Sequence, residues 1–175
     1  LEADKPRVRL LRHPDGRNQG AGATRNLGVN HARCEFLAFL DADDYYLPGR
    51  FEKAETIFLR DPQADGVYEA VGTHFEDDEA RERWYAQHVS ELTTIWEEVP
   101  PTALFEAQAP VGSSGWPHLD GFVLRSSALR KLDSGSTSQA AVGTSVRPFD
   151  ESLRLHQDTA LFIMLSGVFR LFPGH

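Results

Sequence analysis

Short apolar runs alternate with amphipathic stretches along the first 75 residues of the chain. The runs with the length of buried strands are 8–11, 36–40 and 66–71. Between them, apolar residues at helical spacing predict helices over about 23–32 and 48–60, the second with Pro48 in its first turn and Pro62 beyond its end. Strand, helix, strand, helix and strand in this order predict a parallel α/β unit.

The second half of the chain is less regular. A charged amphipathic stretch at 77–92 predicts a surface helix, and 99–117, which is rich in proline, glycine and serine, predicts a long loop. The other elements that we expect are a strand at 121–125, a short helix to Leu132, a helix at about 158–165 and a strand near 168–171. The chain is long enough for one core, so a single domain is expected over 1–175.

The run Phe36–Leu40 ends without a spacer in the turn Asp41-Ala42-Asp43-Asp44. In open α/β sheets, ligands bind beyond the carboxyl ends of the strands, which is where these carboxylates would emerge. Three carboxylates this close repel one another unless a cation, hydrogen-bond donors or water compensates, and their hard oxygens suit Mg²⁺, Mn²⁺ or Ca²⁺. A polar loop whose last aspartate caps the next helix explains the same four residues equally well.

Composition narrows the class of protein. The 175 residues are 41% hydrophobic and carry a net charge of -8, which fits a folded domain and argues against binding to nucleic acid through phosphate neutralisation. The single cysteine, Cys34, excludes an internal disulfide and fits a reducing compartment, so we expect a cytoplasmic protein. No apolar run approaches about 20 residues, so no transmembrane segment is expected, while peripheral association with the inner face of a membrane stays open.

Four motifs follow one another along the chain. They are Asn18-Gln19-Gly20, Ala23-Thr24-Arg25-Asn26-Leu27-Gly28, the stretch from Phe39 to Pro48, and Pro148 to Leu153 followed by Gln157-Asp158-Thr159-Ala160-Leu161. In this order they resemble glycosyltransferase family 2, whose members have the GT-A nucleotide-sugar-binding fold. The resemblance is close over 8–71 and looser over 118–171. It implies an α/β fold with a mostly parallel sheet flanked by helices, and we expect the first βαβ portion of such a fold to be missing here.

The resemblance implies that residues 7–75 bind a UDP-, GDP- or dTDP-sugar and that Mg²⁺ or Mn²⁺ bridges its diphosphate. Asp43 would be the direct metal ligand, while Asp41 would contact the ribose, or the ion through water, and Ala42 would lie between them in the nucleotide-sugar site. Arg25 and Asn26 would lie beside the nucleotide, where a guanidinium suits phosphate or uracil oxygens. A surface arginine paired with an acid is the alternative reading of Arg25.

The resemblance also maps the catalytic base onto Asp158. A transfer with inversion needs a base on the acceptor side of the sugar to take the proton of the acceptor hydroxyl. The residue before the base is Gln157, where the family has glutamate, so one neighbouring negative charge is lost. Asp158 could also simply cap the last helix, and the two roles are compatible.

Residues 76–175 would then bind a glycan or another acceptor with a hydroxyl group. Trp116, His118 and Asp120 precede the strand that borders the expected acceptor cleft, and an indole beside a carboxylate suits a sugar ring, although a plain packed tryptophan is about as good an explanation. Residues 133–147 lack periodicity and are expected to form a mobile loop, either a lid over the acceptor or an insertion.

Two other functions fit parts of the pattern. A metal-dependent nucleotidyl or phosphoryl transferase also uses carboxylates at a strand end, but the glycines at 16, 20 and 22 lack the lysine expected against its phosphates. A non-catalytic remnant that binds a nucleotide is favoured by the expected missing start and by Gln157. We expect inverting glycosyl transfer, with the metal at Asp43 and Asp158 as base, ahead of both.

Overall fold

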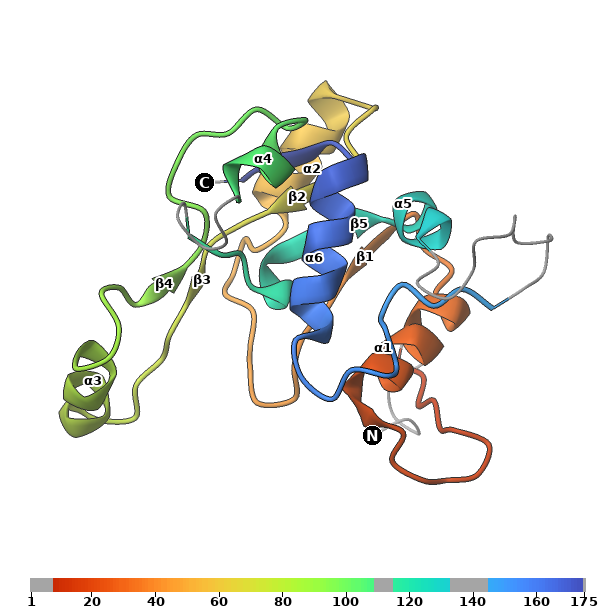
Figure 1. Cartoon of the computed structure of the whole chain (residues 1–175), viewed down its shortest axis with the longest axis horizontal. Helices are drawn as coiled ribbons and strands as arrows, with labels where there is room; N and C mark the ends of the chain where they lie inside the picture. Colours follow the sequence, from red (N-terminus) through yellow and green to blue (C-terminus); the bar gives the residue numbers. More distant parts are fainter. Residues whose placement is uncertain (1–7, 109–114, 133–144, 175) are drawn as a thin grey trace.

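The computed structural model describes residues 8–108, 115–132 and 145–174, so most of the loop expected at 133–147 lies outside the described residues. Its helices are α1 (Gly20–His31), α2 (Glu52–Arg60), α3 (Asp78–Tyr85), α4 (Leu104–Ala107), α5 (Ser126–Lys131) and α6 (Gln157–Val168), with a 3-10 turn, η1, at Leu119–Gly121. Its strands are β1 (Phe36–Ala38), β2 (Gly66–Tyr68), β3 (Val71–Gly72), β4 (Leu92–Thr93), β5 (Phe122–Arg125) and β6 (Leu171–Pro173). Helices flank a central sheet, which confirms the α/β class (Figure 1).

Four strands form the central sheet in the order β1-β5-β2-β6. β2 and β6 are parallel, whereas β5 is antiparallel to both β1 and β2. Three strands therefore point the same way, and β5 runs against them, so the sheet is mixed. The direction of β5 could not be read from the sequence, because Phe122–Leu124 is buried throughout and such an apolar run reads the same in either direction.

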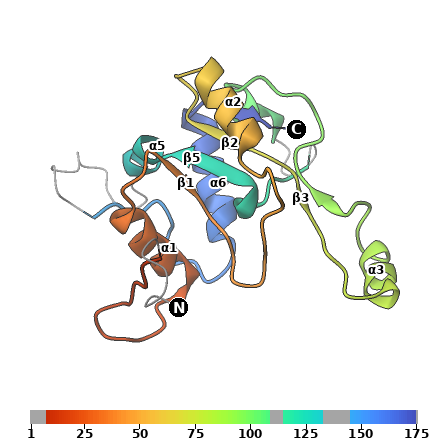
Figure 2. The ribbon, with the colours of Figure 1, turned by 180° about the vertical axis from the view of Figure 1, so that it is seen from behind.

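The strands divide their side chains between two cores on opposite faces of the sheet. On one face, Val67 and Val123 pack with residues of α2. On the other face, Tyr68 and Leu124 pack with residues of α5 and α6. This alternation is the period of two that a strand imposes on its side chains. Figure 1 shows α6 lying across the front of the sheet, and Figure 2 shows β1 and β5 in front of α6 when the molecule is seen from behind.

The strand predicted at 8–11 was wrong, because these residues have no regular structure. Val8 and Leu10 are 46% and 57% exposed, and Arg9 donates to the carbonyl of His31 at the end of α1. A short apolar run forms a strand only when a neighbour supplies backbone partners, and no strand in the described parts of the chain pairs with this one.

Several other elements are shorter than predicted: β1 and α2 by a few residues, and two others by more. The strand expected at 66–71 is split, because β2 ends at Tyr68 and β3 pairs with β4 in a separate two-stranded sheet. The helix expected at 77–92 is only α3, which Asp77 caps by accepting the Ala80 amide at 2.7 Å. Together β3, α3 and β4 form an arm that stands out from the body in both views (Figures 1 and 2).

Gly121 lies where two backbones touch, between η1 and β5. An added Cβ would come within 2.3 Å of the Glu69 carbonyl oxygen, while the Glu69 amide donates to the Gly121 carbonyl at 2.9 Å. We predict that Gly121→Ala lowers the free energy of unfolding by about 1–3 kcal/mol, measured by urea denaturation. Gly28→Ala is the matched control, because an added Cβ inside α1 has nothing within 4 Å. It should raise the free energy of unfolding by about 0.5–1 kcal/mol, and equal effects of the two substitutions would contradict this explanation.

Candidate active site

The acidic turn follows β1 at the carboxyl end of the strand, as the sequence predicts. The amide of Asp44 donates to the Asp41 carbonyl at 3.2 Å, which closes the turn. The hydroxyl of Tyr46 donates to the carbonyl of Phe39, so the chain folds back onto the residues that it has just left. The turn is therefore held by its own backbone and by one tyrosine.

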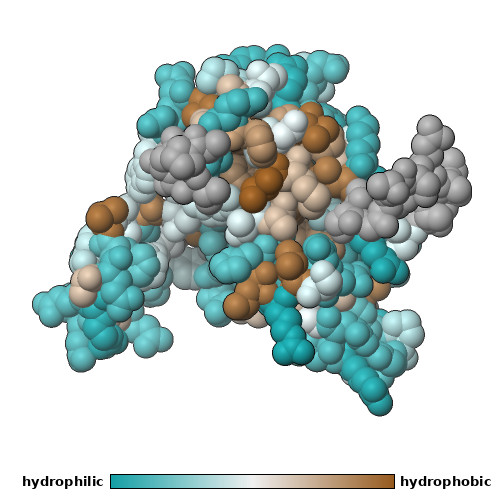
Figure 3. Space-filling model, viewed as in Figure 1, coloured by the Kyte–Doolittle hydropathy of each residue, from teal (hydrophilic) through white to brown (hydrophobic). Residues whose placement is uncertain are grey.

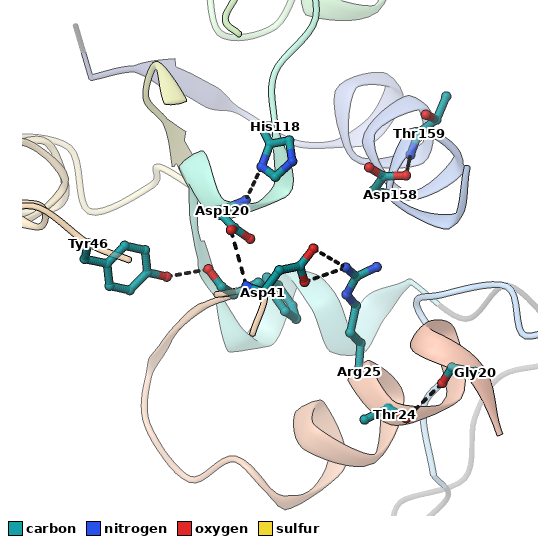
Figure 4. Close-up of polar contacts among 10 residues, drawn as sticks. Gly20, Thr24, Arg25, Asp41, Tyr46, His118, Asp120, Asp158 and Thr159 are labelled. Carbon is teal, nitrogen blue, oxygen red and sulfur yellow. Dashed lines mark hydrogen bonds and ion pairs between the residues drawn. The ribbon is translucent and has the colours of Figure 1, made fainter. Parts of the chain in front are cut away.

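Three carboxylates come together at this turn. Asp41, Asp44 and Asp120 each offer an oxygen, and these oxygens lie within 4.8 Å of one another. Asp120 comes from η1, and its Oδ2 accepts the amide of Asp41 at 3.3 Å (Figure 4). Asp43 is exposed and does not belong to this group, so its role as the direct metal ligand stays a prediction from the motif.

The antiparallel pairing of β5 explains why Asp120 reaches the turn. Ala38, the last residue of β1, lies opposite Val123 near the start of β5. Residues just before β5 therefore lie beside residues just after β1, although 79 positions separate Asp120 from Asp41. In a parallel pair the start of β5 would lie at the other end of β1.

Asp120 is buried without full compensation of its charge. It is 4% exposed, and its Oδ1 has no hydrogen-bond partner in the part of the chain that the structure describes. Burial raises the pKa of the Asp120 carboxyl to about 6, and the Asp44 carboxyl acts in the same direction, while the amide of Asp41 and His118 oppose them. A buried carboxylate oxygen without a partner, next to two further carboxylates, is an environment that a hard divalent cation fits.

Arg50 binds the backbone of Asp120. Its Nη2 donates to the Asp120 carbonyl and its Nη1 pairs with Glu69, both at 3.0 Å. Sequence reasoning missed this arginine, because its only signal is a basic residue after the turn at Gly49. It also missed that Asp44 and Asp120 share one site, since nothing local in the sequence joins them.

A pocket of about 320 Å³ lies beside the cluster. It is lined by Asn18, Gly20, Ala21, Thr24, Arg25, Phe39, Leu40, Asp41 and Ala42, so three of the four motifs meet in it. Arg25 is the one cation among these lining residues. Its guanidinium donates to both oxygens of Asp41, at 2.8 and 3.1 Å (Figure 4). It also lies over the ring of Phe149, at 5.7 Å from the centroid.

Asn26 does not face this pocket, although the motif places it beside the nucleotide. The residue is 3% exposed, and its amide bonds with the backbone of Phe149 and with Glu151. Both the nitrogen and the oxygen of the side chain are therefore engaged within the protein.

Asp158 lies in the first turn of α6 and is partly exposed. Its Oδ1 accepts the amide of Thr159 at 2.9 Å, and Figure 4 shows it on α6, apart from the acidic cluster and with no bond to it. The preceding Gln157 is buried and donates from Nε2 to the Leu153 carbonyl at 2.5 Å. His156, which precedes α6, has a positive φ of 61°, so the chain turns sharply into the helix that carries Asp158.

The predicted acceptor residues lie in two different surroundings. Trp116 packs edge-on against Phe162 of α6, with ring centroids 4.9 Å apart, which is the packing role considered for it. His118 accepts the amide of Asp120 at its Nδ1 over 3.3 Å, so His118 lies next to the acidic cluster to which Asp120 belongs. Asp120 thus joins the half of the chain expected to bind the acceptor to the half expected to bind the nucleotide.

Comparison with known proteins decides the family. Residues 1–122 match glycosyl transferase family 2. The chain belongs to this family. The match covers more than half of the chain and includes both the acidic turn and Asp120, and the mixed sheet flanked by helices agrees with a GT-A-like fold.

Two curated relatives agree with this membership. An uncharacterized glycosyltransferase of Methanocaldococcus jannaschii is 51% identical over 45 residues, which are 26% of this chain and 16% of that protein. An uncharacterized glycosyltransferase of Haemophilus influenzae is 37% identical over 60 residues, which are 34% of this chain and 23% of that protein. The matches span less than a quarter of either relative.

Among the described residues, none of the helices combines the length and the apolar character needed to cross a membrane.

The raised pKa of Asp120 predicts a pH-dependent stability in metal-free solution. Its folded-state pKa of about 6 lies above the ordinary 3.8, so the folded protein holds this proton more tightly than the unfolded chain does. The resulting stability is fully present below about pH 4 and is lost as the pH rises through about 6. We predict that Asp120→Asn, measured by urea denaturation with a chelator, exceeds the wild type by about 1–3 kcal/mol at pH 7.5 and by less at pH 5. Asp43→Asn is the exposed control, and the same pH profile in both variants would exclude Asp120 as the cause.

Proposed function

We propose that the protein is an inverting glycosyltransferase that moves a sugar from a UDP-, GDP- or dTDP-sugar to a hydroxyl of a glycan or another acceptor. The observation that carries the proposal is the pocket where three motifs meet, with Arg25 and the acidic cluster at its edge. A cation beside three carboxylates suits a ligand that combines phosphate oxygens with a divalent metal.

The acidic cluster is the part of the site that would hold Mg²⁺ or Mn²⁺. Asp41, Asp44 and Asp120 offer oxygen ligands from two segments of the chain, and Asp43 is the further ligand that the motif predicts. When bound, such an ion offsets the negative charge that develops on the diphosphate as it leaves. The Oδ1 of Asp120 supports this proposal. It is buried and has no hydrogen-bond partner among the described residues, which is unfavourable for a carboxylate oxygen, and a bound cation would compensate for this.

Arg25 would bind the diphosphate or the nucleobase. The guanidinium now satisfies Asp41, and its planar fork of donors can serve phosphate oxygens from the same position. The ring of Phe149 beneath it restricts the guanidinium to one plane, which favours a defined bidentate contact.

Asp158 would act as the base. As the acceptor oxygen forms its bond to the anomeric carbon, the proton of the acceptor hydroxyl passes to the Asp158 carboxylate. The bond from that carbon to the diphosphate oxygen breaks on the opposite face, which inverts the configuration. The buried amide of the preceding Gln157 donates to the Leu153 carbonyl, which would repel a glutamate carboxylate in the same place, so the local packing explains the departure from glutamate.

The rival functions make different demands on the same pocket. A nucleotidyl or phosphoryl transferase would need further cationic groups against the phosphates, whereas Arg25 is the one cation among the lining residues. A non-catalytic domain would bind the nucleotide and the metal but would not release a diphosphate. Binding and turnover therefore have to be measured separately.

Titration calorimetry with UDP, GDP and dTDP, each with and without Mn²⁺, tests the site. We expect one of these diphosphates to bind in a metal-dependent way, and Asp44→Asn and Asp120→Asn each to weaken that binding at least about tenfold, because a lost ligand oxygen costs at least about 1.4 kcal/mol. Glu55→Gln on the exposed face of α2 is the control. If only Asp43→Asn removes the metal dependence of binding, Asp43 is the metal ligand, as the motif predicts, and the cluster of Asp41, Asp44 and Asp120 does not hold the ion. Indifference to every diphosphate and to Mn²⁺ would contradict the transferase proposal for this chain.

Asp158→Asn separates catalysis from binding. The change removes the proton acceptor but leaves the pocket residues in place, so turnover should fall by about 10²–10⁴. The affinity for the diphosphate and Mn²⁺ should stay within about twofold, because Asp158 does not line the pocket. The measurement is the release of diphosphate from the matching nucleotide sugar. Wild-type turnover in this variant would remove Asp158 from the mechanism.

A further inference from the structure

One face of α1 carries a stripe of three residues with unusual contacts: Gly22, Asn26 and Asn30. They follow one another at intervals of four, so they lie one above the other along the helix. All three contact the segment from Val146 to Gln157 that leads into α6. In Figures 1 and 2 this segment runs beside α1 from both viewpoints.

Asn26 binds both backbone groups of a single residue. Its Nδ2 donates to the Phe149 carbonyl at 2.8 Å, and the Phe149 amide donates to its Oδ1 at 3.0 Å. The second hydrogen of Nδ2 serves the Glu151 carboxylate at 2.9 Å. The side chain of Asn26 is 3% exposed and Phe149 is fully buried, so water does not compete for the two bonds between them.

Asn30 repeats the same pattern one turn later. Its Nδ2 donates to the Val146 carbonyl at 2.7 Å, and the Val146 amide donates to its Oδ1 at 2.9 Å. Nδ2 also lies 2.8 Å from the carbonyl of Asn26, which ties the side chain to its own helix. Two asparagines therefore pair with the segment as a neighbouring strand would, although residues 145–150 belong to no strand.

Gly22 completes the stripe by letting the chain come close. A Cβ added there would lie 3.3 Å from the Asp150 carbonyl oxygen and 3.4 Å from the Gln157 side chain. The segment thus follows α1 from its last turn back to its first and reaches Gln157, the residue next to Asp158.

Phe149 connects the stripe with the pocket. Its ring lies under the guanidinium of Arg25 and packs edge-on against Phe39, at 5.3 Å between centroids, just before the acidic turn. Asn26 therefore holds the backbone of Phe149, and the ring of Phe149 supports the guanidinium of Arg25, which pairs with Asp41.

We infer that Asn26 and Asn30 form a clamp that holds Val146–Glu151 against α1 and thereby positions the start of α6 relative to Arg25. Asn26 and Asn30 are positioning residues, and their catalytic consequence rests on the proposed function. Asparagine suits the task because a short amide presents one donor and one acceptor side by side, which match the carbonyl and the amide of one backbone residue. Aspartate keeps only the acceptor and would face Glu151, while alanine leaves both backbone groups without partners.

Amide hydrogen exchange of the full chain tests the clamp without a substrate. The variants are Asn26→Ala, Asn26→Asp and Asn30→Ala, and Ile57→Ala in the core on the other face of the sheet is the control for general destabilisation. We expect exchange of the Val146 and Phe149 amides, and of the Ala160 amide that bonds to the His156 carbonyl at the start of α6, to rise at least about tenfold in the clamp variants relative to β2 and β5. Asn30 is exposed, so its variant decides the test even if Asn26→Ala does not fold.

A second-site change distinguishes a specific clamp from general loosening. Glu151→Gln combined with Asn26→Asp gives the introduced carboxylate a donor, so the combination should regain part of the protection that Asn26→Asp loses. Unchanged exchange at 146–151, a rise spread equally over β2 and β5, or no recovery in the double variant would each overturn the clamp.

The same variants separate the clamp from the proposed function. In titrations with UDP, GDP and dTDP in the presence of Mn²⁺, the affinity of Asn30→Ala for the diphosphate should stay within about twofold of the wild type. The carboxylates proposed to hold the metal lie on other segments than α1. If the clamp variants show increased amide exchange at the clamped segment and the protein binds a diphosphate, both proposals are supported. If the exchange increases but even the wild type binds no diphosphate, the clamp is supported and the transferase proposal is overturned.

Discussion

The antiparallel entry of β5 between β1 and β2 is the constraint on which the site depends. The register that sets Ala38 opposite Val123 carries Asp120 to the end of β1 and into contact with the Asp41 amide. The same strand supplies buried side chains to both cores, so it cannot slip without exposing one set and burying the wrong one. The position of Asp120 is thus secured by the packing of the whole sheet.

The electrostatics of the site follow from that position. Asp120 loses most of its contact with water, and Arg50 binds its backbone carbonyl and Glu69 instead of its carboxylate. Arg25 compensates Asp41 on the other side of the turn. The cluster therefore keeps more negative charge than the nearby arginines neutralise, and burial favours either protonation or a bound cation. If the cluster holds the proposed metal, pH and metal concentration would decide between these two states, and Asp120 would link the stability of the fold to the occupancy of the site.

Local patterns in the sequence predicted the local parts of this arrangement. The helix at α1, the turn at the end of β1 and the helix that carries Asp158 each follow from apolar spacing and adjoining polar residues. The strand at 8–11 failed because strand formation needs a partner that spacing cannot reveal. The direction of β5 also depends on its partner strands, so the sequence could not predict it. For the same reason, the sequence could not predict that Asp120 contacts Asp41. The motif places Asn26 beside the nucleotide, and this stays a prediction; the structure shows its side chain bound to Phe149 and Glu151, on another side of α1 than Arg25, because consecutive residues on a helix face different sides.

That difference between neighbours on α1 explains how the motifs act together. Arg25 lines the pocket, whereas Asn26 binds the segment before α6, so adjacent residues of α1 contact two different parts of the molecule. Phe149 connects these two parts, because Asn26 binds its backbone and the guanidinium of Arg25 lies over its ring. Motifs more than a hundred residues apart are therefore parts of one packed unit. Gln157 fits the same unit, because its amide lies against Gly22 on this stripe and satisfies the Leu153 carbonyl at the turn into α6. The departure from glutamate thus preserves the packing between α1 and the helix that carries Asp158.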